Sequence, residues 1–173
     1  MAVDAHSLRS LIEDELTTLS DARVVAHVMK MLVEPRAVLR SWDYGAPGQQ
    51  YPCWIVLDDP PHSFSMITFC EFGFGPKCPW GLISSGDMHM GMDSGWFPSF
   101  LDAYFESWAA TELPIWQIMK EEPDQTLVLV NGEGTWASTW DRINELRSAD
   151  PIGRYHCRHA ITYGASRNLP QSA

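Results

Sequence analysis

The chain is poor in cations. Its 173 residues include 12 Lys or Arg against 22 Asp or Glu, so the formal net charge is −10. Proteins that bind nucleic acids neutralise phosphates with clustered cations, and this balance therefore argues against a nucleic-acid partner. An acidic surface keeps a protein in solution, and it can also steer a basic protein into contact.

Long apolar runs and a secretory leader are missing as well. No stretch approaches the length that spans a membrane, and the N-terminal sequence MAVDAHSLRSLIEDEL has no basic segment followed by an apolar one. The four cysteines are irregularly spaced in a chain long enough to fold without disulfides, which favours buried free thiols. We therefore expect a cytoplasmic protein that does not contact a membrane.

The sequence also lacks the known patterns of metal and phosphate sites. It has no C-x-x-C or H-x₃-H pair, and His156 and His159 would face opposite sides of a strand. The serine of Gly91–Gly95 is one position away from the spacing of a nucleophile elbow, and the turn Gly132–Gly134 has no Lys for a phosphate. We expect neither a metal ion nor a cofactor.

An enzyme is nevertheless an alternative. Cys53 or Cys70, or a serine, could act with His89 or His159 in a hydrolase or transferase, if a nearby cation lowered the pKa of the thiol. Both cysteines lie in apolar runs, where buried and inert thiols are the rule. We therefore rank this alternative below a binding function.

The hydrophobic pattern predicts two helices at the N-terminus. Ser10 and Glu13 fit a capping box for a helix over residues 8–19. Asp21 can cap the second helix, and Pro35 is expected to end it.

Short β-prone runs follow, separated by turns rich in Gly, Pro and Asp. They predict a meander of antiparallel strands, with a hairpin turn at Gly86-Asp87 and with the methionines of the last run on one face. The runs cover residues 37–42, 53–57, 64–69, 80–84 and 88–92.

The last third alternates between helical and β patterns. A helix capped by Ser99 is expected to reach about Ala110, and a short helix from Pro114 is expected to end at Pro123. A strand over 126–130, a helix capped by Ser138 and a strand over 154–163 follow, and residues 164–173 are expected to fray.

Together these elements predict an α+β fold. We expect a mainly antiparallel sheet of about five to seven strands, with helices packed on one face and two helices at the N-terminus. The length predicts a single domain over residues 1–173, with a weak boundary near 121–125.

The most unusual composition lies in residues 69–97, FCEFGFGPKCPWGLISSGDMHMGMDSGWF, where Lys77 is the single basic residue. Several aromatic residues here and near position 42 stand beside Gly or Pro turns. Such rings can anchor a partner, although they can also plug the ends of a sheet. The predicted partner-binding residues are Trp42, Asp43, Tyr44, Asp58, Asp59, Phe74, Asp87, Asp93 and Trp96.

Over about residues 40 to 110, the patterns WDYG-x-PG, PCW-x-VL, E-x-GFGP-x-CPWGL and MGMDSGWF resemble a family of small bacterial proteins with no assigned chemistry. In size, acidity and aromatic content the chain also resembles immunity proteins of interbacterial toxin systems. That resemblance implies a non-catalytic protein, a monomer or homodimer, that binds and neutralises a basic toxin domain. A self-associating structural subunit is the further alternative.

Overall fold

The computed structural model of the chain describes residues 3–58, 65–86, 88–92, 94–150, 152 and 158–163. Contacts divide the chain into two compact units, which meet in sequence between Ala110 and Thr111. The α+β class is confirmed, since helices pack against a mostly antiparallel six-stranded sheet and a separate three-stranded one. The single domain over residues 1–173 stays a prediction.

The first helix, α1 (Ala5–Leu16), begins earlier than predicted. Its N-cap is Asp4, whose carboxylate accepts the Ser7 N–H at 2.7 Å, while the Ser7 hydroxyl accepts the Asp4 N–H at 3.0 Å. These two bonds satisfy amide groups that the helix itself leaves unpaired. The predicted cap at Ser10 was wrong because Ser10 lies inside the helix.

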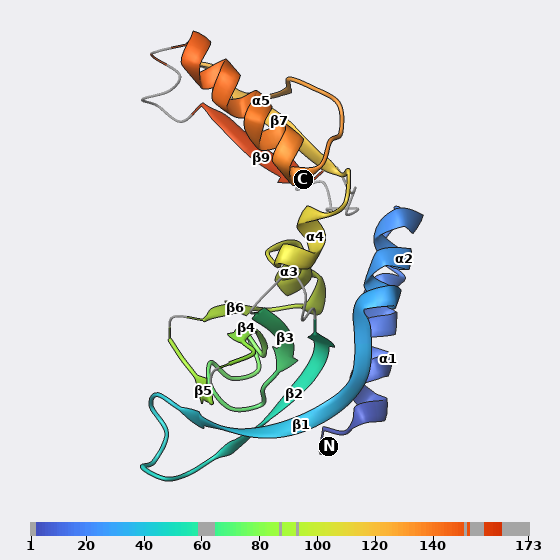
Figure 1. The fold of residues 1–173 in the computed structure, drawn as a ribbon, viewed down its shortest axis with the longest axis vertical. Coiled ribbons are helices and arrows are strands. Elements are labelled where there is room, and N and C mark those ends of the chain that lie inside the picture. The colour runs from blue at the N-terminus through green and yellow to red at the C-terminus, as the bar shows by residue number, and fades with distance from the viewer. Residues whose placement is uncertain are drawn as a thin grey trace. The chain divides into compact units, whose positions relative to one another are not determined.

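The second helix, α2 (Ala22–Met31), is capped by Asp21, as predicted, and runs directly into β1 (Leu32–Trp42). Figure 1 shows this helix continuing into a long, curved strand. Pro35 was expected to end the helix, but it is a residue of β1. The pairing register between β1 and β2 (Tyr51–Asp58) shifts at this point, so the ladder does not require the N–H that proline lacks.

The large sheet has the strand order β5-β1-β2-β3-β4-β6 (Figure 1). Neighbouring strands are antiparallel except β1 and β5, which are parallel. The predicted β-prone runs therefore do form strands. Their bounds are β2 (Tyr51–Asp58), β3 (Ser65–Phe69), β4 (Trp80–Ser84), β5 (His89–Met90) and β6 (Gly95–Phe97).

The predicted hairpin between β4 and the next run was wrong. β5 pairs with β1 at one edge of the sheet, whereas β4 pairs with β6 at the other edge. The predicted common face for the methionines was also wrong, because Met90 is buried while Met88 and Met92 are exposed. The strand is only two residues long, so alternation does not extend through the run. Asp87 of the predicted turn lies outside the described residues.

The large sheet is strongly curled. Trp42 of β1 and Trp96 of β6 are four strands apart in the sheet order, which would separate them by about 19 Å in a flat sheet. Their ring centroids are 6.0 Å apart. The two edge strands, β5 and β6, are joined by residues 91–94 alone, and this short connection holds the edges near one another. We call the place where the edges meet the seam.

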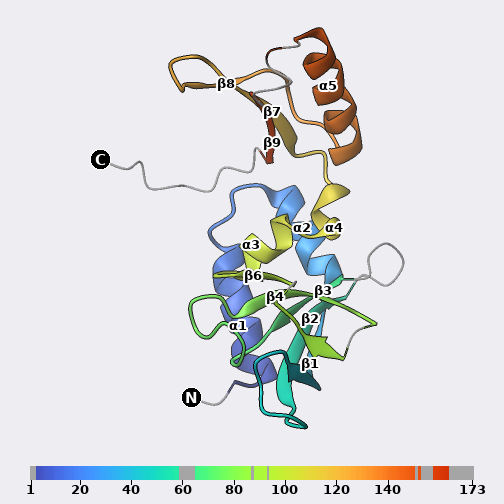
Figure 2. The same ribbon diagram turned by 90° about the vertical axis from the view of Figure 1, so that its left-hand side faces the viewer.

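The two faces of the large sheet carry different cores. On one face, Trp80 packs edge-on against Phe100 of α3 (Phe100–Phe105), and α1 contacts both α3 and β1 (Figure 2). The opposite, concave face is filled by a small cluster of buried residues: Cys53, Cys70, Ile83 and Met90. The curl of the sheet thus encloses a second core that the helices do not cover.

Helix α3 confirms the predicted cap at Ser99, whose hydroxyl accepts the Asp102 N–H at 3.0 Å. It ends at Phe105, and the short α4 (Trp108–Thr111) follows, so the predicted continuous helix to Ala110 is interrupted. Trp108, the first residue of α4, is exposed.

The second unit contains a three-stranded antiparallel sheet with the order β8-β7-β9. Its elements are β7 (Trp116–Glu121), β8 (Leu127–Leu129), α5 (Trp136–Ala149) and β9 (His159–Tyr163), and α5 packs on β7 and β9. The predicted helix after Pro114 was wrong, because Trp116 and Ile118 are buried at the two-residue period of a strand. Helix α5 is capped by Thr135 instead of Ser138.

The predicted strand over 154–163 is confirmed for His159–Tyr163. Residues 153–157 and the predicted frayed tail, 164–173, lie outside the described residues. Within the described ranges, none of the helices combines the length and the apolar character that crossing a membrane requires.

Candidate binding surface at the seam

Four aromatic side chains gather at the seam: Trp42, Tyr44, Phe74 and Trp96. We call this set the aromatic surface. The Phe74 ring centroid lies 5.4 Å from that of Trp42 and 5.4 Å from that of Trp96, and Tyr44 lies 5.7 Å from Trp42. Tyr44 is 72% exposed and Phe74 is 43% exposed, whereas the two Trp rings are partly buried beneath them. Aromatic pairs at these separations stabilise one another, so the rings form one connected patch.

The sheet positions both tryptophans. Trp42 ends β1, and Trp96 lies opposite Gly81 of β4. A Cβ atom at Gly81 would lie 3.1 Å from the Trp96 ring, so the glycine makes room for the indole. The indole Nε1–H donates to the Gly91 carbonyl at 3.0 Å. That bond satisfies the polar end of the ring and fixes its orientation at the seam.

Phe74 is presented by the loop between β3 and β4. The loop is closed at its base by the Cys70 N–H, which donates to the Pro79 carbonyl at 2.8 Å. Gly73 and Gly75, on either side of Phe74, have φ angles of +110° and +76°. Such angles favour glycine, which explains the GFG pattern of the sequence. The loop geometry therefore directs Phe74 onto the two Trp rings.

Asp43 ties the neighbouring segments together. Its carboxylate accepts the Met92 N–H at 2.9 Å, which joins the end of β1 to the connection between β5 and β6. The Gly45 N–H closes a tight turn onto the Trp42 carbonyl at 2.8 Å and leaves Tyr44 projecting from it. Met92, which the sequence did not single out, is exposed at the same seam.

The aromatic surface rests on the second core. Trp42, Tyr51 and Trp96 pack against the buried cluster of Cys53, Cys70, Ile83 and Met90. Interior packing of this kind limits the rotamers that the rings can adopt. A partner would therefore meet side chains that are largely preorganised.

The structure thus brings together five of the predicted residues: Trp42, Asp43, Tyr44, Phe74 and Trp96. Asp58 lies elsewhere, because it ends β2 while Tyr51, at the seam, begins it, a separation of about 23 Å along the strand. Its carboxylate lies 3.6 Å from the Arg36 guanidinium. Asp59, Asp87 and Asp93 lie outside the described residues.

The residues of the enzyme alternative are divided between the two units. Cys53 and Cys70 are 0% exposed, with their Sγ atoms 3.3 Å apart. The hydrogen bond from Cys70 lowers the pKa of the Cys53 thiol, whereas that bond and burial raise the pKa of Cys70. His159 belongs to the second unit, where burial lowers its pKa.

His89 has a polar neighbour that the sequence did not predict. Its Nδ1 lies 2.6 Å from the Ser41 hydroxyl, and both residues are on the surface side of their strands. The two are direct partners in the parallel pairing of β1 with β5, which accounts for their contact. Such pairs cannot be found in a sequence without knowing the strand order.

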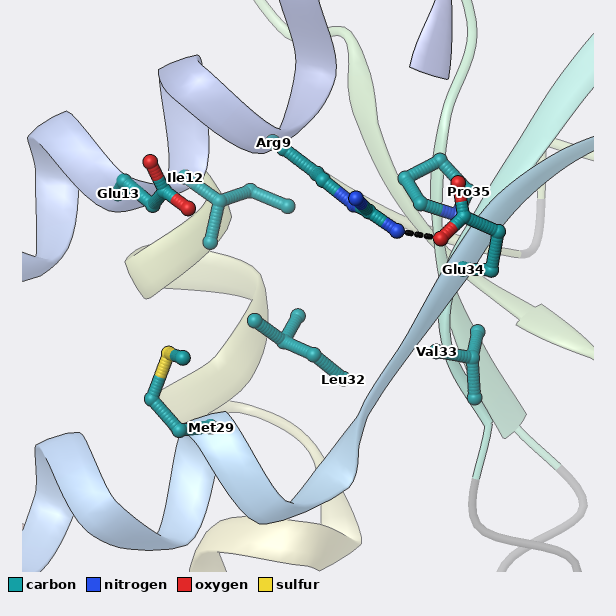
Figure 3. Close-up of a pocket in the computed structure, with 8 residues that line it drawn as sticks. All are labelled: Arg9, Ile12, Glu13, Met29, Leu32, Val33, Glu34 and Pro35. Carbon is teal, nitrogen blue, oxygen red and sulfur yellow. Dashed lines mark ion pairs between the residues drawn. The ribbon is translucent and has the colours of Figure 1, made fainter. Parts of the chain in front are cut away.

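Two hollows border the first unit. One, of about 290 Å³, lies where α1 faces the start of β1; Figure 3 shows Arg9 of α1 reaching across it to an ion pair with Glu34. The other, of about 420 Å³, has the carboxylates of Glu15 and Glu71 among apolar walls that include Trp80, and its described lining holds no Lys or Arg. Glu71 comes from the same loop as Phe74, so this loop contributes to an aromatic patch and to an acidic hollow.

No group of three or more His, Cys, Asp or Glu side chains is arranged to hold a metal ion within the described ranges. Comparison of the chain with protein-family models, curated proteins and solved structures found no match.

Proposed function

We propose that this chain is a binding protein of the immunity type, which binds and neutralises a basic toxin domain in the bacterial cytoplasm without catalysing a reaction. The observation that supports this function best is the aromatic surface. Its four rings come from three separate segments and still form one connected, partly exposed patch. The resemblance to immunity proteins in size, acidity and aromatic content is the reason for proposing a toxin domain as the partner.

The aromatic surface has the physical properties of a binding hot spot. Tyr and Trp are enriched among the residues that contribute most to protein–protein affinity, since a large ring loses few rotamers when it is buried. The Trp rings are held from below and Tyr44 projects above them. A partner that covers Tyr44 and Phe74 would exclude water from the whole patch.

Charge favours a basic partner. The chain carries a net charge of −10, and Glu71 stands on the loop that presents Phe74. Opposite charge accelerates association and discourages acidic competitors, while the aromatic contacts determine how long the complex lasts. Association should therefore slow as salt is added, with a smaller effect on dissociation.

The thiols give the enzyme alternative little support. A nucleophile must touch its substrate, and both Cys53 and Cys70 are enclosed by the second core. These two thiols are therefore less accessible to a substrate than the rings of the aromatic surface are.

Growth protection tests the proposal. A tagged copy of the chain is used to capture its partner from the native bacterium, and the partner gene is then expressed with and without this chain. We expect the partner to arrest growth alone and to be tolerated when wild-type chain is present. A Tyr44→Ala, Trp96→Ala double variant should fail to protect, and Trp140→Ala is the matched control because Trp140 lies in the second unit and is 44% exposed. A captured partner that is harmless on its own would contradict the neutralising role.

A hydrolase is the second candidate, favoured by one observation, the 2.6 Å contact between the Ser41 hydroxyl and His89 Nδ1. A histidine so placed can accept the serine proton when the hydroxyl attacks an ester or amide. A fluorophosphonate probe, which reacts with activated serines, distinguishes the candidates. Labelling that is lost in Ser41→Ala would support the hydrolase, and an unlabelled native protein would remove it.

A further inference from the structure

We infer that Cys53 and Cys70 form an oxidation site, a pair of free thiols that hydrogen peroxide converts to a disulfide between β2 and the end of β3. This inference does not depend on the proposed function. Both cysteines are free in the reduced protein, and their Sγ atoms are 3.3 Å apart.

The backbone already has the geometry of a cross-strand disulfide. Trp54 of β2 pairs with Phe69 of β3, so the next pair along the two antiparallel strands is Cys53 and Cys70, with both side chains on the concave face. The Cys70 N–H donates to Pro79, on the side away from β2. Cys53 and Cys70 are therefore a non-hydrogen-bonded pair, for which Cα atoms lie about 4.5 Å apart, within the range that a disulfide spans.

Little movement is needed to form the bond. A disulfide has an S–S distance of about 2.05 Å, so the two sulfurs must approach by about 1.2 Å. Rotation about the Cα–Cβ bonds can supply this approach without a change of strand register. Cys70 directly follows β3 and Cys53 is the third residue of β2, so the pair lies near the strand ends, where a sheet opens most easily and a molecule as small as peroxide can enter.

The chemistry of the pair is asymmetric. Cys53 is the attacking sulfur, since the hydrogen bond from Cys70 and the charge of Arg40 favour its thiolate. The thiolate attacks one oxygen of hydrogen peroxide, the O–O bond breaks, and the products are a Cys53 sulfenic acid and hydroxide, which takes up a proton to become water. The Cys70 sulfur then attacks the Cys53 sulfur, the S–O bond breaks, and a second water leaves with the Cys70 proton. In total, two thiols and one peroxide give one disulfide and two waters.

Oxidation would affect the loop that carries Phe74. Cys70 forms the base of this loop through its bond to Pro79, so a disulfide would fasten the loop to β2. Larger reagents are excluded by the second core, and we therefore expect peroxide to react where iodoacetamide does not.

The test uses full-length protein in which Cys78 and Cys157 are replaced, Cys78→Ser and Cys157→Ser, so that only the pair can react. After peroxide treatment and unfolding, we expect no iodoacetamide uptake and a mass lower by about 2 Da, both reversed by dithiothreitol. When Cys70→Ala is added to the same background, Cys53 should instead carry an added oxygen after peroxide treatment or remain a thiol.

Two results would overturn the inference. One is two alkylated cysteines after peroxide treatment of protein that circular dichroism shows to be folded. The other is a Cys53 sulfinic acid beside an unmodified Cys70, which would mean that the sulfurs cannot approach. If the background variant fails to fold, chymotryptic mapping of peroxide-treated wild-type protein decides instead, because cleavage after Trp54 and Phe69 separates the two cysteines. Disulfide-linked peptides that carry Cys53 and Cys70 would support the inference, and their absence would overturn it.

Discussion

Glu15 joins two helices that are far apart in the sequence, and its removal should destabilise the first unit. Its two carboxylate oxygens accept the N–H groups of Phe100 and Leu101 at 3.1 and 3.0 Å, at the start of α3. Both donors belong to buried residues, and α3 has few other acceptors for its first amides. Glu15 therefore acts as a cap that α1 supplies to another helix.

The magnitude follows from these two bonds. A hydrogen bond to a charged acceptor contributes about 1.5–3 kcal/mol and a neutral one about 1 kcal/mol. Phe100 and Leu101 bond different oxygens of Glu15, and Glu15→Gln replaces one of these oxygens by an NH2 group that cannot accept. One bond is therefore lost, and the other loses its charge. Allowing for partial replacement by water, we expect the free energy of unfolding to fall by about 2 kcal/mol, and the melting temperature by about 4–8 °C.

Urea denaturation followed by tryptophan fluorescence measures this change. Glu13→Gln is the matched control, because Glu13 is an exposed residue of the same helix and carries the same charge. We expect the control to remain within about 0.5 kcal/mol of wild type. Superimposable curves for the two variants would refute the capping role of Glu15.

Three further substitutions test other parts of the first unit. Gly73→Ala places a side chain at a φ of +110° and should cost about 1–2 kcal/mol, whereas Gly86→Ala, in open space, should be neutral in thermal melts. Asp21→Ala removes the cap of α2 and should cost about 1 kcal/mol at pH 7. Hydrogen bonds from Arg23 hold the pKa of the Asp21 carboxyl below its ordinary value. The stabilisation by Asp21 is therefore present above the unfolded-state pKa and is lost as pH falls through the lower folded-state pKa. In urea titrations, the stabilities of wild type and Asp21→Ala should converge as the folded-state carboxyl becomes protonated. Tyr104→Phe removes a 2.6 Å hydrogen bond to His27 Nδ1 and should cost about 1–2 kcal/mol by the same assay.

The sequence predicts elements well where local chemistry determines them. Asp21 and Ser99 are capping residues whose side chains bond amides two or three residues away, so their role can be read from a short window. Pro114 shows the opposite case. Its fit to a first helical turn is a local preference, but Trp116 and Ile118 alternate as a strand that pairs with residues far along the chain.

The aromatic surface was predictable residue by residue but not as an arrangement. Trp42, Phe74 and Trp96 each stand in or near a turn that contains glycine, which marks them as candidates for partner contacts. Their convergence depends on the curl of the sheet, which follows from the pairing of β5 with β1, and that pairing involves only two residues on each strand. Asp58 was grouped with them because acidic turns look alike in a sequence, although the antiparallel register places it at the other end of β2.

Calorimetric titration of the captured partner with purified variants tests the central claim most directly, that the aromatic surface is the binding face. We expect Trp96→Ala combined with Tyr44→Ala to weaken binding at least about 30-fold, equivalent to about 2 kcal/mol, while Trp140→Ala binds as wild type. Tyr44→Ala alone, at the most exposed of the four rings, should weaken binding with no effect on folding. If the partner bound wild type, Tyr44→Ala and the double variant with equal affinity, the claim would be contradicted and the binding face would lie elsewhere on the chain.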